Sequence, residues 1–81
     1  MRVTVLYFAS FRDAVGRDQE ELELPEGSDV AALWRRLAAE VPLFARLPRP
    51  APAAVNRAHS PVTTILRSGD EVAFLPPVAG G

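Results

Sequence analysis

The last two residues, Gly80 and Gly81, are the part of this sequence best suited to chemistry with a partner protein. Glycine has no Cβ, so a chain end built of glycine passes through a narrow channel that any side chain would block. Val78 and Ala79 come directly before the pair, and we expect them to enter such a channel with Gly80. The terminal carboxylate of Gly81 is then the candidate reactive group.

The residue types that are missing narrow this chemistry. The sequence contains no cysteine, which excludes disulfides, thiolate catalysis and cysteine-based metal sites. All nine basic residues are arginine, so no lysine amine is present to accept an isopeptide bond or to form a Schiff base. Any sulfur chemistry must therefore use a group other than a side chain, and the chain is suited to donate its terminal acyl group.

Other catalytic arrangements find little support in the residues. His59 is the only histidine, and we expect it in a solvent-exposed Ser-Pro loop, without a nucleophile motif or a second group of metal ligands. Glu20, Glu21 and Glu23 lie on one expected strand, where paired acid and base roles cannot be told from surface charge. Glycine-rich phosphate loops are absent. We expect neither a self-contained enzyme nor a metal site.

Length and composition set outer bounds. The 81 residues, 48% of them hydrophobic, are enough for one small domain with a single core. The formal net charge is −1 and the arginines are scattered among ten acidic residues, so a nucleic-acid partner is not expected. The sequence has no apolar run near the roughly 18 residues that span a bilayer and no signal-peptide pattern. The expectation is a cytoplasmic protein without a membrane association.

Local patterns in the first third predict two strands and a short helix. The β-branched and aromatic run Arg2–Phe8 is typical of a strand. Ser10 has the residue type of a helix cap, and Gly16 is suited to a left-handed helix end. Gln19–Leu24 alternates charged and apolar residues as a half-buried strand does, and Pro25-Glu26-Gly27 should end it in a turn.

The main helix is predicted over Val30 to Val41, where apolar residues recur at helical spacing up to Pro42. A short helical turn and an extended proline-rich connector should follow, over 43–47 and 48–52. Short strands are expected at 53–56 and 63–66 around a loop at 58–61. A turn at 68–70 then leads into a last strand over 71–75.

This order predicts an α+β fold, with one mixed sheet packed on one main helix and the first and last strands side by side. Residues alternate between the two faces of a strand, so Leu6, Phe8 and Leu75 should point away from the helix. One interpretation is that a loop covers these apolar side chains. The other is a partner-binding face next to the tail, continued by Pro76 and Pro77.

The ending of the chain resembles the molybdopterin synthase small subunit family (MoaD), in which a strand runs into Phe-Leu-Pro-Pro-Val-x-Gly-Gly, here residues 74–81. The likeness extends over nearly the whole chain, through Phe8-Ala9-Ser10-Phe11-Arg12, Gly16 and Ala53-Ala54-Val55-Asn56. This sequence departs from the family at the proline-rich connector and at His59, where relatives tend to be apolar.

The resemblance implies a ubiquitin-like β-grasp domain at 1–77 and a flexible tail at 78–81. It also implies that an activating enzyme (MoeB-like) uses ATP and Mg to adenylate the Gly81 carboxylate, which is then converted to a thiocarboxylate. The tail would insert into a catalytic large subunit (MoaE-like), within an assembly of two small and two large subunits. There it would donate sulfur to cyclic pyranopterin monophosphate in molybdenum cofactor biosynthesis. The chain itself would bind no cofactor and have no activity alone.

Three alternatives stay open on the sequence. A diglycine end is shared with sulfur carriers of other pathways, such as those for thiamine or for tRNA thiolation. It is also shared with ubiquitin-like modifiers, whose terminal glycine forms isopeptide bonds with target lysines. The third alternative is a small interaction module whose tail is inert.

Overall fold

The computed structural model describes residues 1–76, so Pro77 and the tail residues Val78, Ala79, Gly80 and Gly81 lie outside the described residues. Within 1–76 the chain forms five strands and three helices. In chain order they are β1 (Arg2–Leu6), α1 (Ala9–Val15), β2 (Gln19–Glu23), α2 (Val30–Glu40), α3 (Pro42–Arg46), β3 (Ala53–Val55), β4 (Ala58–Ser60) and β5 (Glu71–Phe74).

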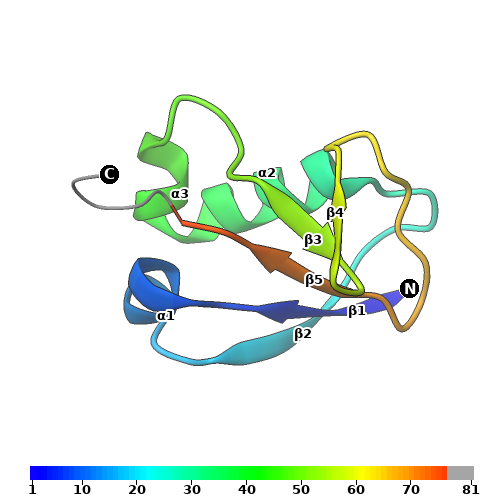
Figure 1. The fold of residues 1–81 in the computed structure, drawn as a ribbon, viewed down its shortest axis with the longest axis horizontal. Helices are drawn as coiled ribbons and strands as arrows, with labels where there is room; N and C mark the ends of the chain where they lie inside the picture. Colours follow the sequence, from blue (N-terminus) through cyan, green and yellow to red (C-terminus); the bar gives the residue numbers. More distant parts are fainter. Residues whose placement is uncertain (77–81) are drawn as a thin grey trace.

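The strands form one mixed sheet in the order β2-β1-β5-β3-β4, with α2 running along one side of it (Figure 1). The first and last strands, β1 and β5, are central and parallel, and every other neighbouring pair is antiparallel. This arrangement confirms the expected α+β class and the adjacency of the first and last strands. It is the topology of the ubiquitin-like β-grasp fold.

The main helix α2 forms where the apolar spacing predicted it. The Asp29 carboxylate caps it by accepting a 2.8 Å hydrogen bond from the amide of Ala32, one of the first-turn amides that have no partner within the helix. Its apolar face, which includes Leu33 and Leu37, is buried. Pro42 then starts the separate short helix α3 in the region where a helical turn was expected.

The short helix α1 differs from expectation at its start. Phe8 holds the capping position and makes no side-chain cap, so the expected cap Ser10 lies inside the helix. The expected end is confirmed, because Gly16 adopts a left-handed conformation with φ of 87°. Its amide donates a 2.8 Å hydrogen bond to the carbonyl of Arg12. A residue with a Cβ would be strained in this conformation.

The prediction of a strand at residues 63–66 was wrong. This segment makes only an isolated bridge to the residue before α2. Backbone carbonyls in and next to this segment instead accept hydrogen bonds from the first amides of α2. The carbonyl of Thr64 accepts a 3.1 Å hydrogen bond from the Val30 amide, and the carbonyl of Val62 accepts a 2.9 Å hydrogen bond from the Ala31 amide. Satisfying these helix-terminal amides outweighs the local preference of Thr and Ile for a strand.

The fourth strand lies instead at Ala58–Ser60, where a loop was expected. It pairs with β3 through a two-residue turn at Asn56 and Arg57, whose φ angles are 51° and 71°. Two positive φ values are what a tight hairpin requires, because they match the twist of the flanking strands. Asparagine and glycine are the usual residues at these two positions. Because arginine occupies the second position, the sequence does not indicate the turn.

An aromatic cluster forms the centre of the core between the sheet and the helices. Phe44 of α3 packs edge-on against Phe11 of α1, with ring centroids 4.7 Å apart. Trp34 of α2 contacts both Phe44 and Phe74, at centroid distances of 5.1 and 5.0 Å. Aromatic pairs in such tilted arrangements stabilise the fold by more than the apolar area they bury. The cluster ties all three helices to the end of β5, where the chain leads toward the tail.

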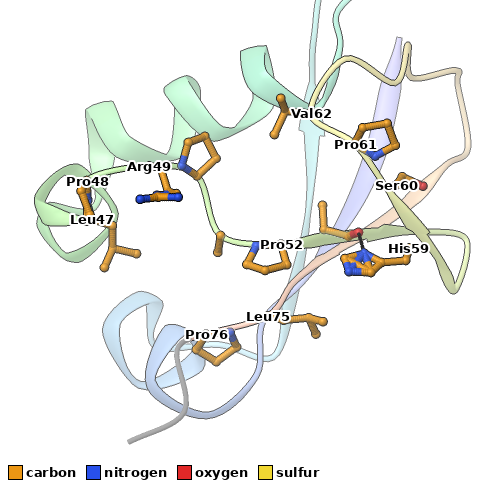
Figure 2. Close-up of a pocket in the computed structure, with 13 residues that line it drawn as sticks. Leu47, Pro48, Arg49, Pro52, His59, Ser60, Pro61, Val62, Leu75 and Pro76 are labelled. Carbon is orange, nitrogen blue, oxygen red and sulfur yellow. Dashed lines mark hydrogen bonds between the residues drawn. The ribbon is translucent and has the colours of Figure 1, made fainter. Parts of the chain in front are cut away.

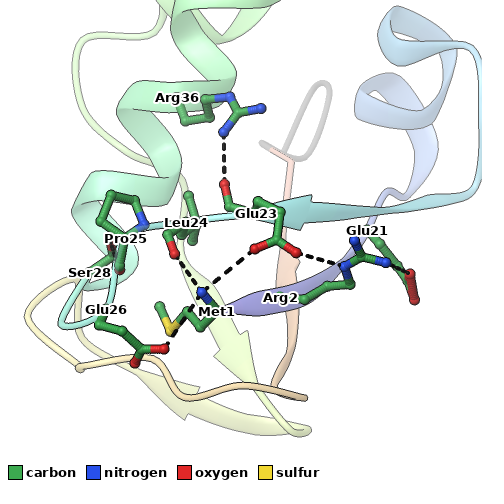
Figure 3. A network of polar contacts seen from close by, with 9 residues as sticks. All are labelled: Met1, Arg2, Glu21, Glu23, Leu24, Pro25, Glu26, Ser28 and Arg36. Carbon is green, nitrogen blue, oxygen red and sulfur yellow. Dashed lines mark hydrogen bonds and ion pairs between the residues drawn. The ribbon is translucent and has the colours of Figure 1, made fainter.

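A surface network joins the start of β1 to the end of β2 (Figure 3). The amino group of Met1 donates a 2.8 Å hydrogen bond to the carbonyl of Leu24 and lies 3.6 Å from carboxylate oxygens of Glu23 and Glu26. The guanidinium of Arg2 donates a 2.9 Å hydrogen bond to Glu23, which lowers the pKa of that carboxyl. The side chains of Arg2, Glu23 and Glu26 are exposed, so their ion pairs contribute little to stability.

None of the helices within residues 1–76 is both long and apolar enough to cross a membrane.

Candidate functional site

The parallel pairing of β1 and β5 positions the candidate partner-binding face. Val5 is paired with Val72, and both are fully buried toward the helices. The next pair along the strands, Leu6 and Ala73, is only partly buried. Since side chains alternate between faces, Leu6 and Ala73 lie on the face of the sheet that α2 does not cover. We refer to this as the outer face.

Phe8 and Leu75 continue the outer face beyond the ends of their strands. Each stands two residues after a member of the Leu6–Ala73 pair, and Phe8 has an extended backbone that preserves the alternation. Phe8 is 46% exposed and Leu75 is 43% exposed. Parallel strands end at the same edge of a sheet, so both apolar side chains lie at the end from which the tail departs. No segment within 1–76 covers them fully, and their partner-binding role stays a prediction.

Of the remaining predicted site residues, only Pro76 lies within the described residues 1–76. Pro76 is partly buried directly after Leu75. Leu75 itself is held by a 2.8 Å hydrogen bond from its amide to the carbonyl of Pro52. Pro77, the predicted threading residues Val78, Ala79 and Gly80, and the predicted reactive residue Gly81 lie outside the described residues.

His59 belongs to the outer face, which the sequence did not indicate. In the sheet register His59 pairs with Ala54, Ala54 pairs with Ala73, and Ala73 pairs with Leu6. Directly paired residues share one face, so the four side chains form a row across the sheet. His59 is exposed on a strand and was expected in an exposed loop. The exposure was correct, but the place in the row depends on the hairpin at 56–57.

A hollow of about 720 Å³ adjoins this face and was not predicted at all (Figure 2). The connector Leu47–Pro52 forms one side, β4 with Pro61 and Val62 forms another, and Leu75 and Pro76 border it as well. Its lining is mainly apolar and contains the prolines of the connector. The run of prolines was the only signal in the sequence, and it predicted stiffness without showing what the connector faces.

The carboxylates considered as catalytic candidates have structural partners. The Tyr7 hydroxyl donates a 2.5 Å hydrogen bond to Glu20, and Arg2 binds Glu23 and approaches Glu21 at 3.4 Å. The pKa of the Tyr7 hydroxyl is raised, mainly by burial and secondly by the hydrogen bond to Glu20. Within the described residues no group of three histidine, aspartate or glutamate side chains is placed to hold a metal ion. These three carboxylates therefore take part in contacts within the fold.

Comparisons with known proteins agree with this picture. The ThiS family matches residues 5–81. The molybdopterin synthase sulfur carrier subunit of Mycobacterium tuberculosis is 40% identical over 82 residues, covering 100% of this chain and 99% of that protein.

Two solved structures extend the comparison. The putative molybdopterin converting factor subunit 1 of Pyrococcus furiosus superposes with a TM-score of 0.86 at 34% identity, over 96% of this chain and 99% of that one. A Helicobacter pylori complex of subunits 1 and 2 of molybdopterin-converting factor contains a chain that matches with a TM-score of 0.67 at 27% identity, over 100% of both chains.

Proposed function

We propose that this chain, which belongs to the ThiS family, is the sulfur carrier subunit of a molybdopterin synthase. The observation that carries the proposal is the end-to-end match to a sulfur carrier subunit at 40% identity, together with a family match that reaches Gly81. The described structure supports it in a second way. The fold presents exposed Phe8 and Leu75 beside the point where the tail leaves the domain.

The chemistry assigned to Gly81 follows from the properties of a carboxylate. With Gly81 as the terminal residue, its carboxylate has an ordinary pKa of about 3.3–3.7 and is ionised at neutral pH, which makes it a poor electrophile. An activating enzyme with ATP and Mg converts it to an acyl adenylate and releases pyrophosphate. A sulfur donor then displaces AMP and leaves a thiocarboxylate. Because the sulfur is carried at the terminus, a chain without cysteine suffices.

The acceptor is cyclic pyranopterin monophosphate, bound by a catalytic large subunit. The carbon–sulfur bond of the thiocarboxylate is broken as sulfur passes to the acceptor, and water returns the oxygen that restores the carboxylate. The Helicobacter pylori neighbour forms a complex with a second subunit, which supports a large-subunit partner here. We further propose that two small and two large subunits assemble.

Docking must supply most of the affinity in this scheme. Ordering the backbone of residues 78–81 costs roughly 1–2 kcal/mol per residue, and the glycines return little contact. Residues 77–81 span at most about 17–18 Å when extended, so the domain must dock close to the acceptor pocket. Phe8, Leu75 and Pro76 lie at that end of the described domain and are the proposed contacts.

The decisive experiment is the intact mass of the untagged protein, purified from its own cells under conditions that preserve thioacids. We expect a mass gain equal to the replacement of one oxygen by sulfur, localised to Gly81. A variant that lacks Gly80 and Gly81 should fold and dock but carry no sulfur. An unmodified chain found linked to lysines of other proteins would favour a ubiquitin-like modifier. Sulfur transfer by the truncated variant would overturn the role of Gly81.

A further inference from the structure

The hollow beside the outer face has stiff apolar walls. Five prolines contribute to its lining: Pro48, Pro50, Pro52, Pro61 and Pro76. Their rings fix the backbone, so the walls lose little freedom when they are covered. The volume of about 720 Å³ falls within the roughly 300–1,000 Å³ of typical ligand pockets, which is room for a short peptide segment.

One positive charge in this hollow has no counterpart. Arg49 lies between Pro48 and Pro50, is exposed, and makes no ion pair with any residue within 1–76. None of the described residues that line the hollow is acidic. A guanidinium next to an apolar surface is suited to a bidentate carboxylate.

His59 adds a second polar group to the same hollow. Its Nδ1–H donates a 3.4 Å hydrogen bond to the carbonyl of Ala53, which orients the ring (Figure 2). The hollow thus combines apolar walls with a cationic group on the connector and an imidazole on β4. A purely apolar occupant would leave the charge of Arg49 without a partner.

We propose that this hollow binds a segment of the large subunit in which a bulky apolar side chain lies next to an aspartate or glutamate, with Arg49 holding the carboxylate. The inference rests on the proposed function, because that function supplies the large subunit as a partner. The position of the hollow supports the choice, since Leu75 and Pro76 border both the hollow and the tail. A partner that receives the tail therefore binds near the rim of the hollow that Leu75 and Pro76 form.

The test is the affinity of the full chain for the large subunit of the same organism, measured by calorimetry. We expect Arg49→Glu to weaken binding at least tenfold. The matched control is Arg35→Glu, the same charge reversal on the exposed side of α2, which should change the Kd less than twofold. Equal affinity of wild type and Arg49→Glu, equal weakening by both variants, or no binding by wild type would each overturn the proposal.

A photo-reactive amino acid at Val62, which lines the hollow, identifies the occupant. The expected product is a cross-link to an acidic and apolar segment of the large subunit. A cross-link to residues 77–81 of the same chain, to a second copy or to the activating enzyme would reject the proposed occupant. Mass spectrometry of thiocarboxylate formation at Gly81 distinguishes a failure of the hollow proposal from a failure of the sulfur-carrier proposal. The Arg49→Glu variant should still form the thiocarboxylate. If the wild-type protein forms no thiocarboxylate, the sulfur-carrier function itself is refuted.

Discussion

The Tyr7 hydroxyl donates a 2.5 Å hydrogen bond to the carboxylate of Glu20, which joins the end of β1 to β2 at the boundary between core and solvent. Tyr7 is buried and stacks on Phe44, with ring centroids 6.4 Å apart. Arg17 approaches the same carboxylate at 3.4 Å. The pair is a structural contact that fixes the backbone directly before Phe8, one of the proposed docking residues.

This contact predicts an unusual alkaline titration. Burial and the Glu20 carboxylate raise the pKa of Tyr7 above the value of about 10 in an unfolded chain. The folded state therefore holds the proton more tightly. Its contribution to stability is complete below pH of about 10 and is lost as the pH rises from there toward the folded pKa. Tyr7 is the only tyrosine, so phenolate absorbance reports this group alone.

We expect the folded protein to show no phenolate until alkaline unfolding begins, and the urea-denatured protein to titrate near pH of about 10. Tyr7→Phe supplies the blank for the absorbance. A folded protein that titrates like the denatured one would contradict the contact.

Truncating Leu37 to alanine should strongly destabilise the domain. Leu37 is 1% exposed on the core face of α2, and such truncations cost about 2–5 kcal/mol in free energy of unfolding. That is a large share of the roughly 5–15 kcal/mol typical of a domain. Urea unfolding measures the loss. Arg35→Ala, on the exposed side of the same helix, should stay within about 0.5 kcal/mol, and a similarly small effect at Leu37 would refute the helix-on-sheet core.

Introducing a charge at Phe8 should separate docking from folding. Phe8 is nearly half exposed, so Phe8→Glu should leave the thermal unfolding midpoint close to that of wild type. On the proposed function, the same change should weaken binding to the large subunit at least tenfold. The control is Ile65→Glu, which alters a 56% exposed residue in the segment that bridges to Asp29. If Phe8→Glu unfolds the protein, Phe8 belongs to the core instead.

Replacing Arg57 with glycine should stabilise the β3–β4 hairpin. Arg57 has a φ of 71°, a left-handed conformation that costs a residue with a Cβ roughly 1–2 kcal/mol. Glycine removes that cost but loses more entropy on folding, so we expect a net gain of about 0.5–1 kcal/mol in the free energy of unfolding. Arg67→Gly, at a residue without positive φ, is the destabilising or neutral control. A loss of stability in Arg57→Gly would mean that the arginine side chain makes a compensating contact.

Periodicity along the chain was enough to predict which residues face the core. The alternation in Arg2–Phe8 and 71–75 placed Val5 and Val72 inside and Phe8 and Leu75 outside, and the helical spacing of α2 was equally clear. These features depend only on the period of a strand or a helix. Composition was likewise enough to exclude side-chain thiolate and lysine-amine chemistry, because the sequence has no cysteine and no lysine.

Only the tertiary structure decided which side chains become neighbours. The strand at 58–60 exists because Asn56 and Arg57 form a hairpin without glycine, and that hairpin carries His59 into the row with Leu6. The segment at 63–66 has a strand-like pattern but forms no strand, because the carbonyls of Val62 and Thr64 accept hydrogen bonds from the first amides of α2. The connector prolines form a hollow only because β4 and Leu75 lie opposite them. Each outcome depends on contacts between residues distant in sequence, which local propensity does not encode.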